Sequence, residues 1–166
     1  MSGFLRLLSL SIALIAAPTQ SAAEVEPPGR VGRISLASAG TQLRIGDSLA
    51  SGEDALNWPL TTGAFIETSA GGRSEVRIGS MALHIDGDTA LEFADLDDAR
   101  IRLRLHRGSI VIVLRNPEHA AETTLETPEG SLRFETPGSY RADVAGGTTA
   151  FSAYRGRAFI ETLGLT

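Results

Sequence analysis

The chain has 166 residues, a formal net charge of −5 and no cysteine. A net acidic chain lacks the basic surface that general nucleic-acid binding requires, so we expect no nucleic-acid partner. The absence of cysteine excludes disulfides, thiolate metal sites and cysteine nucleophiles. Hydrophobic residues make up 42% of the sequence, and a chain of this length can therefore bury a sizeable core without covalent staples.

Residues 1–23 have the pattern of a secretory signal peptide. A single basic residue, Arg6, precedes an apolar run from Leu7 to Ala17, and Ser21-Ala22-Ala23 supplies the small residues that signal peptidase reads. The apolar run is shorter than the roughly 20 residues that a membrane-spanning helix needs. We therefore predict cleavage after Ala23, a periplasmic or secreted location, and a mature chain that does not span the membrane.

After a flexible lead-in over residues 24–30, the sequence from 31 to 161 is dominated by period-2 alternation of apolar and polar side chains. This alternation is typical of β-strands with one buried face, and glycine- or proline-bearing turns separate the runs. Residues 162–166 are expected to form a frayed tail. The predicted strands span residues 31–37, 41–45, 64–68, 74–78, 81–85, 89–93, 101–105, 110–114, 122–127, 131–135, 139–144, 148–154 and 157–161.

The regular spacing of these runs predicts one all-β domain of about a dozen short strands, built as a twisted β-solenoid or roll, or as a sandwich. The run Ile101–Leu105 is expected to form a half-buried strand. Gly108 separates it from Ile110–Leu114, which is expected to be buried on both faces or at an edge of the core. Residues 57–60 and 117–121 are expected to hold at most a turn.

Several stretches, taken in order and at their spacing, resemble the FecR family. Members of this family are extracytoplasmic β domains found in regulators of iron-responsive sigma factors and in other envelope proteins. The resemblance implies an all-β, roll-like domain without catalytic residues. It is carried by residues 59–63 (PLTTG), 74–85 (SEVRIGSMALHI), 102–110 (RLRLHRGSI), 126–128 (ETP) with 134–144, and 154–158 (YRGRA), within a match over roughly 29–160.

The sequence shows no pattern of residues typical of an enzyme. His84, His106 and His119 lie on separate predicted elements without metal-ligand spacing, and neither a nucleophile elbow nor a phosphate loop occurs. The acidic runs 86–88 and 95–98 do not follow the spacing of calcium-binding loops, and turn chemistry explains them more simply. We therefore predict no catalytic residue, no metal site and no cofactor.

Arginines form one candidate binding face. Arg100, Arg102 and Arg104 alternate along one predicted strand, and Arg107 follows them. Guanidinium groups in such a row can contact lipid phosphate or an acidic glycan. Alternatively, the row is a solvated strand face that discourages edge pairing. The acidic residues 95–98 just before it favour the solvated interpretation, because they can neutralise the row locally.

Trp58, the single tryptophan, is the other candidate binding residue. A tryptophan in a loop can stack on a sugar or anchor a protein partner. It can also act as a plug over one end of the core, and this interpretation is favoured.

Two functions remain open from the sequence. The first is binding to another envelope protein, a receptor or a membrane-anchored regulator, through exposed strand edges whose backbone groups accept an added strand. The second is binding to carbohydrate or cell wall through Trp58 and the arginine face. Aromatic residues make up only 5% of the chain, fewer than a glycan-binding surface would lead us to expect, so protein binding is favoured.

Overall fold

The computed structural model describes residues 29–162. The predicted signal peptide (1–23), the lead-in up to residue 28 and the tail from 163 lie outside the described residues. Within residues 29–162 the chain folds into a single 14-stranded sheet, which confirms the all-β prediction. None of the described helices is both long and apolar enough to cross a membrane.

The strands are short except for one near the middle of the chain. A 3-10 helix, η1 (Gly52–Ala55), and an α-helix, α1 (Pro117–Glu122), complete the set. The strands are β1 (Gly32–Ala37), β2 (Thr41–Ile45), β3 (Ser48–Ser51), β4 (Pro59–Leu60), β5 (Phe65–Thr68), β6 (Ser74–Ile78), β7 (Met81–Ile85), β8 (Ala90–Leu96), β9 (Ile101–Leu114), β10 (Thr123–Thr127), β11 (Gly130–Phe134), β12 (Gly138–Ala145), β13 (Thr148–Arg155) and β14 (Ala158–Thr162).

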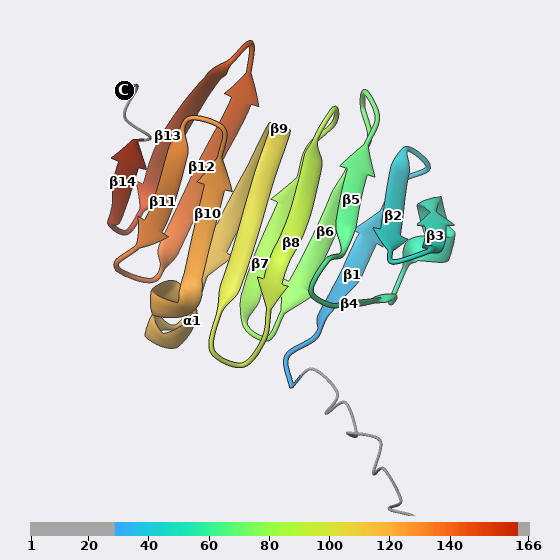
Figure 1. Cartoon of the computed structure of the whole chain (residues 1–166), viewed down its shortest axis with the longest axis horizontal. Helices are drawn as coiled ribbons and strands as arrows, with labels where there is room; N and C mark the ends of the chain where they lie inside the picture. The colour runs from blue at the N-terminus through green and yellow to red at the C-terminus, as the bar shows by residue number, and fades with distance from the viewer. Residues whose placement is uncertain (1–28, 163–166) are drawn as a thin grey trace, which may run out of the picture.

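The sheet curls back on itself into two layers that lie face to face (Figure 1). The first layer has the order β4-β1-β6-β7-β9-β12-β13, and the second has the order β3-β2-β5-β8-β9-β10-β11-β14. Neighbouring strands are antiparallel except for β9 and β10, which are parallel. Because the chain moves between layers as it advances, Figure 1 shows blue and teal strands at one end of the roll and red strands at the other.

Strand β9 joins the two layers. Residues 101–107 pair with β8 and β10 in the second layer, and residues 108–114 pair with β7 and β12 in the first. The chain crosses at Gly108, whose φ of +88° lies in the region that favours glycine. The two runs that the sequence separates at Gly108 are therefore one continuous strand.

The core lies between the layers and follows the period-2 pattern of the strands. Ile101, Leu103 and Leu105 of β9 are fully buried, while the residues between them are partly exposed. The second half of β9 keeps this alternation: Val111 and Val113 are only half-buried. The expectation that this segment is buried on both faces or at an edge of the core was therefore wrong about both-face burial, because the outer face of the first layer is open to solvent.

Four further elements differ from the sequence predictions. Strands β3 and β4 were not predicted, and Thr162 belongs to β14 rather than to the tail. Residues 117–122 form a short α-helix, not just a turn. Asn116 begins this helix because its side-chain oxygen accepts a hydrogen bond of 2.8 Å from the backbone N–H of His119, and Pro117 occupies the first helical position.

Candidate functional site: the open end of the roll

The two ends of the roll differ in how they are closed. At the end formed by β3 and β4, η1 contacts β1, β2 and β3 and buries Ala55 completely. Trp58 is half-buried and packs against the core, as the favoured interpretation of this residue predicts. The edge strand β4 contains Pro59, which has no backbone N–H to offer a further strand. The core at this end is therefore covered, and we call it the capped end. The outer edge of β3, a strand of four residues, has no partner strand among residues 29–162.

Within residues 29–162, no element covers the opposite end, formed by β13 and β14, and we call it the open end. Ile160 of β14 pairs with the buried Leu132, so it faces the core, yet 58% of its surface is exposed. Phe151 of β13 pairs with the buried Ala142 and is also only partly covered. A small hollow of about 70 Å³ between the two strands has the buried Tyr140 among its lining residues. The hydrophobic interior is therefore exposed at this end.

The outer edge of β13 has the composition of an accepting strand. Residues Thr148–Tyr154 include no charged side chain and no proline, which are the usual devices that block edge pairing. One edge of β13 pairs with β12, and the other edge has no partner strand among the described residues. Tyr154 and Phe159 add exposed apolar surface nearby, at 66% and 61% exposure. The edge is therefore long, partly apolar and uncharged from Thr148 to Tyr154, and Arg155 lies at its end.

Local sequence sets the position of both edge strands. Gly146 and Gly147, both with positive φ, form the two-residue hairpin loop between β12 and β13. Gly156 has a φ of +98°, and a Cβ there would lie 2.8 Å from Cζ of Tyr140. The Tyr140 hydroxyl donates a hydrogen bond of 2.6 Å to the carbonyl of Thr136, and it lies 3.0 Å from the carbonyl of Arg157. Tyr140 therefore anchors the turns that lead into β12 and β14.

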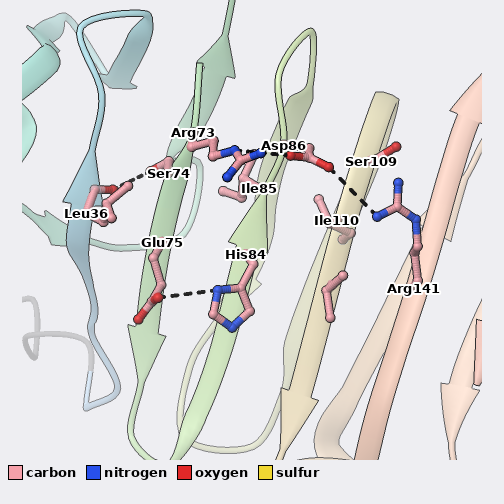
Figure 2. Close-up of a pocket in the computed structure, with 11 residues that line it drawn as sticks. Leu36, Arg73, Ser74, Glu75, His84, Ile85, Asp86, Ser109, Ile110 and Arg141 are labelled. Atoms are coloured by element: carbon pink, nitrogen blue, oxygen red, sulfur yellow. Dashed lines mark hydrogen bonds and ion pairs between the residues drawn. The ribbon is translucent and has the colours of Figure 1, made fainter. Parts of the chain in front are cut away.

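A second candidate is a polar hollow of about 380 Å³ on the outer face of the first layer. Figure 2 shows Glu75 and His84 paired across β6 and β7, and Asp86 placed between Arg73 and Arg141. Nδ1 of His84 lies 3.3 Å from Oε2 of Glu75. The Asp86 carboxylate lies 3.7 Å from Arg73 and 3.8 Å from Arg141. Opposite charges therefore meet within the hollow.

Carboxylates around this hollow are held in their ionised form. Burial raises the pKa of Glu75, but hydrogen bonds from Ser35 and Arg77 and the nearby positive charges outweigh it, so the pKa lies below its ordinary value. Hydrogen bonding from Arg141 lowers the pKa of Asp143 against the opposing effect of burial. Each of these carboxylates is therefore already matched by groups of the chain itself.

The hydroxyl groups of this hollow are also engaged. Ser74 donates a hydrogen bond of 3.0 Å to the carbonyl of Leu36, and Ser109 donates to Asp143. Neither hydroxyl is bonded to His84, so the lining residues do not form a nucleophile–base pair. Across residues 29–162, no group of three or more His, Cys, Asp or Glu is placed to hold a metal ion.

The predicted arginine face is only partly as expected. Arg102 and Arg104 lie half-exposed on the outer face of the second layer. Arg100 instead lies before β9, in the turn that follows β8. Arg107 is exposed, and its guanidinium lies 3.0 Å from the Glu67 carboxylate. The four arginines therefore do not form a single row.

Acidic partners neutralise the two arginines on the strand. Arg104 lies 3.2 Å from Glu92 and 3.0 Å from Glu126, and Arg102 lies 2.8 Å from Asp95. Hydrogen bonding to Glu126, together with the charge of Glu92, raises the pKa of Arg104 above its ordinary value. This cross-strand ladder of alternating charge favours the solvated-face interpretation over an anion-binding face.

Sequence reasoning did not single out the β13 edge. The signal was present as the uncharged run from Thr148 to Tyr154, but period-2 alternation does not say which strand of a sheet is outermost. Comparisons of the chain with protein-family models, with curated proteins and with solved structures find no match.

Proposed function

We propose that the mature chain is a non-catalytic, FecR-like module of the bacterial envelope that binds another envelope protein, a receptor or a membrane-anchored regulator. The observation that carries this proposal is the open end, where an uncharged edge strand lies beside an exposed hydrophobic interior. An exported protein with this end uncovered presents both elements that strand addition needs.

The partner contributes an extended segment to the outer edge of β13. Its backbone pairs with the N–H and C=O groups of β13 that do not bond to β12, and these bonds fix its position. Alternate side chains of the segment enter the gap beside Phe151 and Ile160. Each apolar side chain that becomes fully buried there contributes about 1.5–3 kcal/mol. Signalling then depends on whether the end is occupied.

The carbohydrate alternative requires an exposed Trp58 ring and arginines on β9 without acidic partners, and the structure shows neither. Trp58 packs partly against the core, and Arg102 and Arg104 are matched by carboxylates. Within residues 29–162, the outer edge of β13 has no partner strand from the chain itself. Protein binding is therefore the better-supported function.

The chain has neither cysteine nor lysine, so a maleimide reagent labels only a cysteine that is introduced by mutation. A Ser152→Cys variant of residues 24–166 carries a single thiol on β13, to which a maleimide-linked benzophenone is attached. A Leu49→Cys variant places the same probe on β3 at the capped end, where Leu49 is 73% exposed. Both labelled proteins are irradiated with envelope fractions of the source bacterium, and the products are identified by mass spectrometry.

We expect one envelope protein to be captured from Ser152→Cys and not from Leu49→Cys. The crosslinked peptide of that protein should be an extended segment with alternating apolar residues. Equal capture at both positions, or recovery of the domain on the wall or glycan fraction without a protein partner, would overturn the proposal.

A further inference from the structure

The edge strand β13 has a property that binding to a foreign segment does not require. Its side chains from Thr148 to Tyr154 are all uncharged. Thr149, Phe151 and Ala153 face the interior, because they pair with the buried residues of β12, and Ala150 and Ser152 lie on the outer face. From Thr148 to Tyr154, either face of the strand can therefore meet an identical strand without placing like charges together. Arg155, the last residue of β13, would lie at opposite ends of an antiparallel pair centred on this segment.

The lack of charge on β13 favours pairing with a second copy of the same strand about a two-fold axis. When a strand pairs antiparallel with its own copy, each side chain lies opposite or diagonal to a residue of the same short segment. A single charged residue near the axis would then face its own copy, and like charges in cross-strand positions destabilise a sheet. A foreign strand could balance a charge on β13, whereas a second copy could not.

The interiors of two copies also complement each other. Ile160 and Phe151 leave the interior of each copy partly exposed at this end. Joining two open ends about a two-fold axis continues both layers and brings these apolar residues against their counterparts. The charge on β14 does not interfere, since Glu161 is paired with Arg133 of the same chain.

The capped end limits this assembly to two copies. Head-to-tail addition would need an accepting edge at β3 and β4. Strand β4 has two residues and begins with Pro59, β3 has only four residues against the eight of β13, and η1 covers the neighbouring core. Symmetric pairing of open ends therefore closes on itself, and within residues 29–162 the edges that remain at the far end belong to the short strands β3 and β4.

We propose that a second copy of this chain occupies the open end when no other partner is bound, so that the partner must displace it. This inference rests on the proposed function, because both occupants use the outer edge of β13. Self-pairing protects the exposed interior before the partner arrives, and it makes the apparent affinity for the partner fall as the concentration of the domain rises.

The test is analytical ultracentrifugation of residues 24–166 over a concentration series, with two variants of opposite charge. Ser152→Lys and Ser152→Glu each place like charges near the two-fold axis, and circular dichroism confirms that each variant is folded. Leu49→Lys carries a charge at the capped end and serves as the matched control. An equimolar mixture of the two Ser152 variants pairs opposite charges across the axis.

We expect the unmodified domain and Leu49→Lys to sediment as dimers, each Ser152 variant alone as a monomer, and the mixture as a dimer again. A monomer at every concentration, a dimer that neither Ser152 variant affects, or a mixture that stays monomeric would overturn the inference. A monomer that still captures an envelope protein through Ser152→Cys overturns self-pairing alone. A dimer with no envelope partner overturns the proposed function alone.

Discussion

The crossing of β9 between the layers depends on a glycine that no other residue can replace cheaply. Gly108 has a φ of +88°, and a Cβ there would lie 2.7 Å from Cβ of Thr89 and closer still to its Cα and Oγ1. Thr89 is fully buried and cannot move aside, because its hydroxyl bonds the backbone of Ser109. Gly108→Ala therefore combines an unfavourable backbone conformation with a clash in the core.

The first effect costs about 1–2 kcal/mol and the second costs about 1–3 kcal/mol. Gly63→Ala is a matched control, because Gly63 has a φ of +82° and an added Cβ there would have nothing within 4 Å. We expect urea unfolding, followed by circular dichroism, to show a loss of about 2–5 kcal/mol for Gly108→Ala and about 1–2 kcal/mol for Gly63→Ala. Equal losses in the two variants would refute the close approach of β9 to Thr89.

Three other predictions concern Trp58 at the capped end, Tyr140 at the turns of the open end, and Glu92 in the cross-strand ladder of alternating charge. Trp58→Ala should lower the free energy of unfolding by about 1–3 kcal/mol without changing retention on insoluble peptidoglycan; reduced retention at unchanged stability would favour the carbohydrate alternative. Tyr140→Phe removes the hydroxyl bonded to Thr136 and should cost about 1 kcal/mol in the same assay, and an unchanged stability would contradict the anchoring role. Burial raises the pKa of Glu92, but hydrogen bonding to His106 and the nearby positive charges hold it below 4.5. The Glu92 carboxyl therefore binds a proton more readily in the unfolded chain than in the folded one. The ionised Glu92 side chain stabilises the fold above pH 4.5, and this stabilisation is lost as the pH falls through the pKa of Glu92 in the folded protein. Glu92→Gln should flatten the acid side of the stability–pH curve, and an unaltered curve would contradict the assignment.

Period-2 alternation located most strands because burial between two layers leaves one face of each strand in contact with the core. The predicted ranges 41–45, 74–78 and 81–85 match β2, β6 and β7. Strand β3 was missed because its sequence Ser48–Ser51 has no β-branched residue and its Leu49 is exposed. Strand β4 was missed because two residues beginning with proline carry no periodic signal.

Features that depend on how strands are arranged could not be predicted from the sequence. Gly108 has the appearance of a turn, and only the pairing of β9 with strands of both layers shows that the chain continues as one strand from one layer into the other. The arginines at 102 and 104 looked like a ladder for anions, and their acidic partners Glu92 and Glu126 come from neighbouring strands. In the same way, the uncharged run on β13 supports the proposed binding edge only because that strand is outermost among the described residues.

Hydrogen exchange of residues 24–166, alone and with any envelope protein that the Ser152→Cys probe captures, tests strand addition most directly. The amides of β13 that do not bond β12 should exchange rapidly in dilute domain alone and become protected in the complex, while β3 and η1 at the capped end stay unchanged. Protection at the capped end or over the hollow around Glu75 and Arg141, with none along β13, would contradict binding at the open end.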